Sequence, residues 1–162
     1  MGNSWKEEMI SRIKPKPSAV ERMKGGMRME RWKDLAILVG RILLALIFLQ
    51  SGIGKIENFA GTAQYMASQG MPYASFFLVG AIFFELVGSI TVILGYFTRL
   101  GAVLILIFLI PTTLIFHNIW VDPKMMIQFM KNVSIFGGFL FVLAAGAGRY
   151  SLDHFLRGGQ GK

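Results

Sequence analysis

Four long stretches of the chain are almost entirely apolar, and polar segments separate them. An α-helix needs about 20 residues to cross the roughly 30 Å hydrocarbon core of a bilayer. Three of the stretches have that length, and the fourth reaches it only with the residues that flank its apolar centre at 133–147. The pattern therefore predicts four membrane-spanning helices. We place them at about residues 35–53, 75–96, 100–119 and 131–149.

A soluble helical domain is the alternative interpretation of this pattern. Each helix of such a domain would carry a polar face at helical spacing, and the four stretches offer almost no polar face. We therefore predict an all-α integral membrane protein, with a four-helix bundle at 34–153, a basic tail at 1–33 and a short tail at 154–162. Two connecting segments, roughly 54–74 and 120–132, are long enough to hold short helices that lie at the membrane interface.

Lysine and arginine are distributed unevenly about the predicted spans. Nine of them lie in residues 1–33. If this tail is cytoplasmic, Arg99 and the cations after the fourth span share its side, whereas Lys55, Lys124 and Lys131 lie on the other. Because cytoplasmic segments carry the excess of Lys and Arg, we predict that both termini are cytoplasmic. The tail is expected to be solvated; the alternative is a strip that lies on anionic lipid or docks on a partner.

The composition excludes several classes of chemistry. The chain has no cysteine, which excludes disulfide exchange, thiolate-bound metals and cysteine-ligated iron–sulfur clusters within it. Its two histidines, His117 and His154, are predicted on opposite sides of the membrane, too far apart to ligate one haem. No metal motif, flavin motif or dinucleotide loop is present. The net charge of +8 is attributed to topology and lipid rather than to nucleic acid, because most cations lie in a tail beside a span.

Glu85 lies near the middle of the second predicted span, in a stretch that is otherwise uncharged. A carboxylate at that depth costs several kcal/mol, so it is expected to face protein, water or a partner charge. Small residues share helix faces with the charged ones, so we expect two such faces to meet inside the bundle. One face comprises Arg41, Ala45, Phe48, Gly52 and Lys55, and the other Ala81, Glu85, Gly88, Val92 and Gly95.

Two interpretations of Glu85 stay open, and they are compatible. In the first, Arg41 and Glu85 form a buried ion pair that only holds the helices together. In the second, Glu85 exchanges a proton with a bound ligand, because burial favours the neutral acid.

A second polar group is expected at the outer ends of the first and third spans. It comprises Gln50, Ser51 and Lys55 together with His117, which can exchange a proton near neutral pH. Our candidates are therefore Glu85 and His117 for acid–base chemistry, and Arg41, Gln50 and Lys55 for ligand binding. Aromatic side chains near these groups would suit a flat lipophilic ligand such as a quinone; the alternative is that they face lipid or pack the bundle. They are Phe48, Phe76, Phe77, Phe83, Phe84 and Phe116.

Several short motifs in order along the chain resemble the DoxX/DoxD-like family of small four-helix membrane proteins. The resemblance implies four transmembrane helices and a multi-pass protein of the prokaryotic plasma membrane. Some relatives are linked to quinone-coupled oxidation, as in the DoxD-type subunit of thiosulfate:quinone oxidoreductase. The motifs lie at 41–56, 69–72, 85–88, 94–99, 129–132 with 137–138, and 148–153, with His117 between the fourth and the fifth.

Our leading hypothesis is a membrane subunit of a quinone-linked redox system that binds a quinone or a similar lipophilic ligand within the bundle. Without cysteine, haem ligands or a flavin motif, electrons would pass through a partner or directly between bound ligands. A protein partner or a second copy of the chain is therefore expected, in addition to the lipid bilayer. The alternative is a non-catalytic membrane anchor or assembly factor for a partner enzyme. A small-solute transporter is disfavoured because no internal repeat is detectable.

Overall fold

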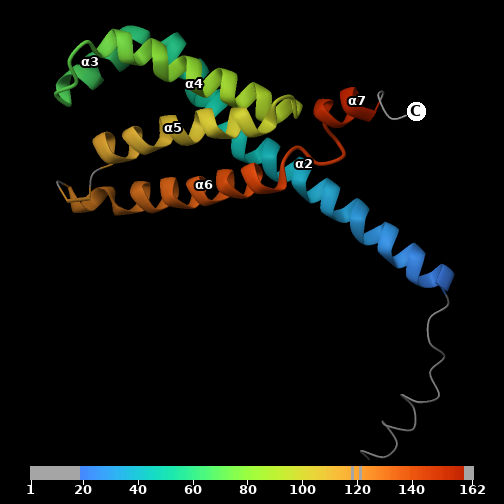
Figure 1. Ribbon diagram of the computed structural model, residues 1–162. Coiled ribbons are helices and arrows are strands. Elements are labelled where there is room, and N and C mark those ends of the chain that lie inside the picture. The colour runs from blue at the N-terminus through green and yellow to red at the C-terminus, as the bar shows by residue number, and fades with distance from the viewer. Residues whose placement is uncertain (1–18, 118, 121, 159–162) are drawn as a thin grey trace, which may run out of the picture. The chain divides into compact units, whose positions relative to one another are not determined.

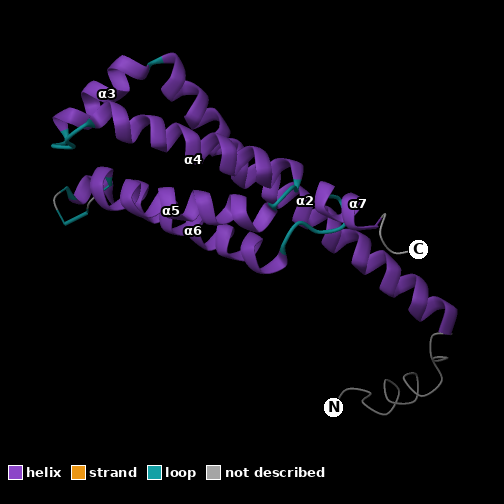
Figure 2. Ribbon diagram, turned by 45° about the horizontal axis from the view of Figure 1, so that its top comes forward, coloured by secondary structure: helices purple, strands orange, loops and turns teal. Residues whose placement is uncertain are grey.

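The structure is a computed structural model that describes residues 19–117, 119–120 and 122–158. The chain divides into two compact units, Met1–Lys33 and Asp34–Lys162. In the first unit the described residues are helical, and residues 25–33 are exposed. Helices account for all regular structure in the described part of the chain, as Figures 1 and 2 show. They are α2 (Ala19–Glu57), α3 (Phe59–Ser68), α4 (Ala74–Leu94), α5 (Thr98–Phe116), η1 (Pro123–Met125), α6 (Met126–Ala145) and α7 (Leu152–Gly158).

Four segments are long and apolar enough to cross a membrane. This confirms the all-α class and the expectation of four long apolar helices. The short helix predicted within 54–74 is present as α3. The four segments are Gly25–Glu57, Ala74–Leu94, Thr98–Phe116 and Pro123–Ala145.

Glycines in the left-handed region set helix ends that apolar character alone does not reveal. Gly95 (φ 70°) ends α4 at Leu94, two residues before the predicted end. Gly146 (φ 74°) follows the last residue of α6, which ends four residues before the predicted span does. Because glycine adopts positive φ without a Cβ penalty, the chain can turn at both points while its sequence stays apolar.

The two predicted small-residue faces meet inside the bundle. On α2, Arg41, Ala45 and Phe48 are buried, and on α4, Glu85 and Val92 are buried. A Cβ added at Gly52 would lie 2.8 Å from a methyl group of Leu86, and one added at Gly95 would collide with the Arg41 guanidinium. Since Gly52 meets Leu86 while Arg41 meets Gly95, α2 and α4 run antiparallel.

Helices α4, α5 and α6 lie side by side in both views (Figures 1 and 2). The backbones of α4 and α5 approach closely, because a Cβ added at Gly88 would lie 3.1 Å from the carbonyl oxygen of Gly101. Phe48 of α2 packs edge-on against Phe108 of α5 and Phe139 of α6, with ring centroids 6.3 and 5.5 Å apart. The core therefore draws on all four long helices. Its buried members are Ala45, Phe48, Val92, Ala102, Ile105, Leu106, Leu109, Phe139 and Val142.

The segment after α6 is tied to the bundle by polar contacts. Arg41 donates hydrogen bonds to the carbonyl oxygens of Ala147 (2.6 Å) and Tyr150 (2.5 Å). The Asp153 carboxylate accepts from the backbone N–H groups of Phe97 (3.1 Å) and Thr98 (3.3 Å), at the start of α5. Asp153 thereby supplies acceptors for N–H groups that a helix N-terminus leaves unpaired.

Candidate functional site

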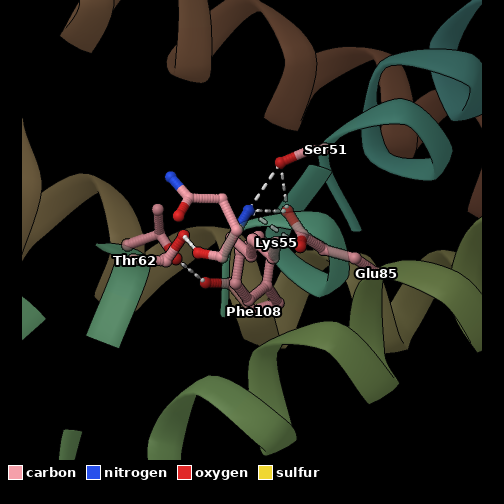
Figure 3. A network of polar contacts seen from close by, with 7 residues as sticks. Ser51, Lys55, Thr62, Glu85 and Phe108 are labelled. Atoms are coloured by element: carbon pink, nitrogen blue, oxygen red, sulfur yellow. Dashed lines mark hydrogen bonds and ion pairs between the residues drawn. The ribbon is translucent and has the colours of Figure 1, made fainter. Parts of the chain in front are cut away.

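Glu85 forms a buried ion pair with Lys55, near the middle of α4 (Figure 3). The Lys55 Nζ lies 3.0 Å from Oε1 of Glu85 and 2.9 Å from Oε2. Ser51 completes the group: its hydroxyl donates to Glu85 Oε1 (2.9 Å) and accepts from Lys55 Nζ (2.6 Å). The Glu85 side chain is 2% exposed and that of Lys55 is 22% exposed. The charge of the buried carboxylate is therefore balanced within the bundle, and its two hydrogen bonds are both accepted by Oε1.

The predicted pairing of Arg41 with Glu85 is wrong. Arg41 is 2% exposed, but its guanidinium bonds the carbonyl oxygens that follow α6. In the structure Arg41 is level with Gly95, ten residues from Glu85, or about 15 Å of helix. The partner of Glu85 comes instead from the far end of α2.

A cavity of about 1140 Å³ lies beside this ion pair. Residues of α3, α4 and α5 line it, and Lys55 contributes from α2. The lining is mainly aromatic and aliphatic, with few polar groups. All but one of the phenylalanines predicted as an aromatic wall are among the lining residues, namely Phe76, Phe77, Phe83, Phe84 and Phe116.

Phe48 is the exception, because it is 5% exposed and belongs to the core. Phe108 takes its place in the wall, with its ring centroid 5.8 Å from Lys55 Nζ. Phe76 and Phe83 are more than half exposed, so the wall reaches the outer surface of the bundle. A ligand dissolved in the bilayer would therefore meet the cavity from the side.

The polar groups of the cavity are few and come from different elements. His117 follows α5 and lies outside the Thr98–Phe116 segment; its Nδ1 is buried and has no hydrogen-bond partner among the described residues. Burial and the nearby positive charge of Lys131 lower the pKa of His117, so the imidazole is neutral at neutral pH. Thr62 and Gln69 add polar groups from α3 and its C-terminal end. Pro111 cannot donate to the carbonyl of Ile107, and both residues line the cavity.

The structure brings some of the predicted site residues together and separates others. Lys55 and His117 both line the cavity, and Glu85 lies behind Lys55. Arg41 lies at the opposite end of α2, and Gln50 is exposed and does not line the cavity. The contribution of α3 to the cavity was not predicted, because the short helix expected within 54–74 was not assigned to the site. Its aromatic and methionine content, at Tyr65 and Met66, was the available signal.

Comparison with known proteins identifies the family. The DoxX family profile matches residues 36–118. This chain belongs to the DoxX family. Inner membrane protein YqjF of Escherichia coli is 38% identical over 128 residues, which cover 79% of this chain and 97% of that protein. Inner membrane protein YphA of Escherichia coli is 40% identical over 127 residues, 75% of this chain and 90% of that protein.

The name of a third relative refers to a chemical activity. The Bacillus subtilis protein called "Putative oxidoreductase CatD" is 32% identical over 77 residues, 48% of this DoxX chain and 56% of that protein. No solved structure matches this chain. The family and the four long apolar helices are thus established, and the ligand of the cavity is a separate question.

Proposed function

We propose that this DoxX protein is a membrane subunit of a quinone-linked redox system, and that a quinone or a similar lipophilic ligand occupies the cavity between α3, α4 and α5. The observation that carries the proposal is the composition of the cavity: aromatic walls around a few polar groups, one of them the ammonium of Lys55. Ligand sites for drug-sized molecules are mainly apolar, with volumes of roughly 300–1,000 Å³ and a small number of placed polar groups. The cavity, at about 1140 Å³, is slightly larger than that range and has the same kind of lining.

The names of the relatives agree with the proposal. YqjF and YphA are named inner membrane proteins, and CatD is named a "Putative oxidoreductase". The names support a location in the plasma membrane of a prokaryote. From the charge distribution we propose in addition that both termini are cytoplasmic.

In this proposal Lys55 and His117 contact the ligand and act as acid–base groups or hydrogen-bond partners. Oxidation of a quinol to a quinone releases two electrons and two protons. The neutral His117 can accept one proton from a quinol hydroxyl, and the second proton is released to water. The ammonium of Lys55 can donate a hydrogen bond to the quinone carbonyl that forms. Glu85 acts through Lys55, because it holds the ammonium in place and is itself enclosed. The electrons are exchanged with a partner redox protein, since the sequence offers no cysteine or flavin motif of its own.

Filling the cavity tests the proposal. Gly80 lines the cavity, and a Cβ added there meets nothing within 4 Å, so the side chain introduced by Gly80→Leu should occupy part of the cavity without disturbing the helix. The purified protein in native-lipid nanodiscs should bind a short-chain ubiquinone or menaquinone analogue. We expect Gly80→Leu to weaken that binding by about tenfold or more, because the added side chain occupies the ligand's volume.

Gly137 provides the matched control. It lies on α6, is exposed, does not line the cavity and also has nothing within 4 Å of an added Cβ. Gly137→Leu should therefore bind the analogue as the unsubstituted protein does. If the folded protein binds neither analogue, or if both leucine variants bind equally well, the proposal fails and a non-catalytic anchor or assembly factor is favoured.

A further inference from the structure

Gln50 lies at the mid-depth of the bundle but faces away from it. Its neighbour Ser51 donates a hydrogen bond to Glu85, which is near the middle of the 21-residue helix α4. Phe48 and Gly52 are both buried, and each lies two residues from Gln50, about 200° around the helix. Gln50 is accordingly exposed. A primary amide therefore faces the layer that lipid would occupy.

An amide in that position is costly without a hydrogen-bond partner, because hydrocarbon offers neither donors nor acceptors. Within the described residues Gln50 makes no hydrogen bond or ion pair. Two other exposed polar side chains of α6 lie near this depth, Lys131 and Ser134. Ser134 donates to the carbonyl oxygen of Met130 in its own helix (3.0 Å), and the long stem of Lys131 allows its ammonium to reach toward the membrane surface. Gln50 lacks an internal partner and is too short to reach the surface in this way.

The residues around Gln50 allow another helix to approach closely. Leu43, Ile47 and Gly54 lie on the same face of α2 and are all exposed. A Cβ added at Gly54 would meet nothing within 4 Å. Interfaces between membrane helices combine small residues with polar side chains that hydrogen-bond across them. This face, defined by Leu43, Ile47, Gln50 and Gly54, is the Gln50 face below.

We infer that the Gln50 face of α2 pairs with the Gln50 face of a second copy of this chain. Polar complementarity identifies the occupant: an amide carries both donors and an acceptor, so two identical glutamines across a two-fold axis satisfy each other. The proposed interface is separate from the cavity, because neither Gln50 nor Ile47 lines it. It goes beyond the proposed function, and it would hold even if the cavity bound no quinone.

Single cysteines test the pairing directly, because the chain contains none of its own. Ile47→Cys leaves Gln50 in place and lies one turn away on the Gln50 face, at a residue that is 44% exposed. Mild oxidation of native membranes should give a disulfide-linked dimer. The matched control is Val133→Cys on α6, at a residue that is 46% exposed. Val133 is close to the same depth, because Gly138 of α6 packs against Leu44 of antiparallel α2.

We expect the Ile47→Cys protein to cross-link several-fold more than the Val133→Cys protein. Adding Gln50→Leu to Ile47→Cys should lower the dimer fraction, and in the cysteine-free protein it should weaken dimerisation by about 3- to 20-fold, as measured by energy transfer on dilution in lipid. The proposal would be overturned by equal cross-linking at the two positions or by cross-linking to a different protein alone. It would also be overturned if the protein were monomeric in native lipid, or if Gln50→Leu had no effect on dimerisation. Quinone binding is measured independently, so its failure would leave this result unchanged.

Discussion

Glu85 and Lys55 are oppositely charged residues that pair in the interior of the bundle. Their charges are taken out of water and balanced by each other and by Ser51. Such a pair contributes little net stability when intact, because desolvation offsets the attraction between the charges. Removing one partner is different, since it leaves a single charge enclosed in the bundle. The pair therefore adds little to the stability of the protein, but it makes the site sensitive to any substitution that removes only one of the two charges.

We predict that Glu85→Gln and Lys55→Met will each lower the free energy of unfolding by about 3–5 kcal/mol, because each leaves one buried charge without its counterpart. The double variant should regain most of that loss. Reversible unfolding of the detergent-solubilised protein in sodium dodecyl sulfate measures all three values. The exposed pair Lys33–Glu30, with Nζ 3.0 Å from the carboxylate, is the control, and Glu30→Gln should cost less than about 1 kcal/mol. Additive losses in the double variant would show that the two charges do not depend on each other.

The sequence revealed Glu85 but not its partner. A charge within an apolar stretch is visible from hydropathy alone, because its cost depends on depth. The choice between Arg41 and Lys55 depends on how far α2 slides along α4, and hydropathy does not encode that offset. Packing of Gly52 against Leu86 and of Gly95 against Arg41 sets it. The sequence correctly placed Arg41 and Lys55 on one face of α2. Only the register of α2 against α4 decides which of the two pairs with Glu85.

At the scale of whole elements, close contact between α4 and α5 depends on glycine. A Cβ added at Gly101 would lie 2.9 Å from the carbonyl oxygen of Gly88 and would collide with the hydroxyl of Thr91. Backbone cannot yield as a flexible side chain can, so the helices would have to separate. Their separation would also alter the cavity, because α4 and α5 supply most of its lining.

We predict that Gly101→Ala will destabilise the protein by about 1–3 kcal/mol, because overpacking at a tight contact forces a backbone shift. Gly137→Ala, at an open position of α6, should be neutral or stabilising by up to about 1 kcal/mol through helix propensity. Thermal unfolding in detergent, followed by circular dichroism, compares the two variants. A Gly101→Ala protein as stable as the Gly137→Ala protein would show that the two backbones are not in close contact.

Elements also differ in how well the sequence predicts them. The long helices and their buried faces follow from apolar length and from the spacing of small and charged residues, and the structure confirms both. The wall that α3 adds to the cavity could not be predicted in this way. Its residues Tyr65 and Met66 meet α4 and α5 only after the chain has turned back at Asn58. Tertiary contacts of a short helix have no periodic signal in so few residues.

Under the two proposals, the whole molecule binds a lipophilic ligand on one side and a second copy of the chain on another. The cavity lies between α3, α4 and α5, and the Gln50 face lies on the part of α2 that these helices leave exposed. Dimerisation through α2 would then leave lateral access to the cavity open in each copy. A redox partner would reach the assembly at its water-exposed ends, where η1 and the α4–α5 turn lie.

The orientation of the assembly in the membrane determines which side such a partner approaches, and charge distribution predicts it. Tyr96, in the turn between α4 and α5, should be cytoplasmic, and Lys124, in η1, should face the opposite side. Both residues are exposed, and the chain has no cysteine, so Tyr96→Cys and Lys124→Cys each give one reactive site.

A membrane-impermeant maleimide is added to intact cells, or to spheroplasts where an outer membrane is present. It should label the Lys124→Cys protein at once, and the Tyr96→Cys protein only after the plasma membrane is permeabilised. The reverse pattern would invert the topology and place His117, together with its end of the cavity, at the cytoplasmic surface. Labelling of both variants from the same side would contradict the four-span arrangement itself. In that arrangement α5 crosses the membrane once between the turn that holds Tyr96 and the segment that holds Lys124.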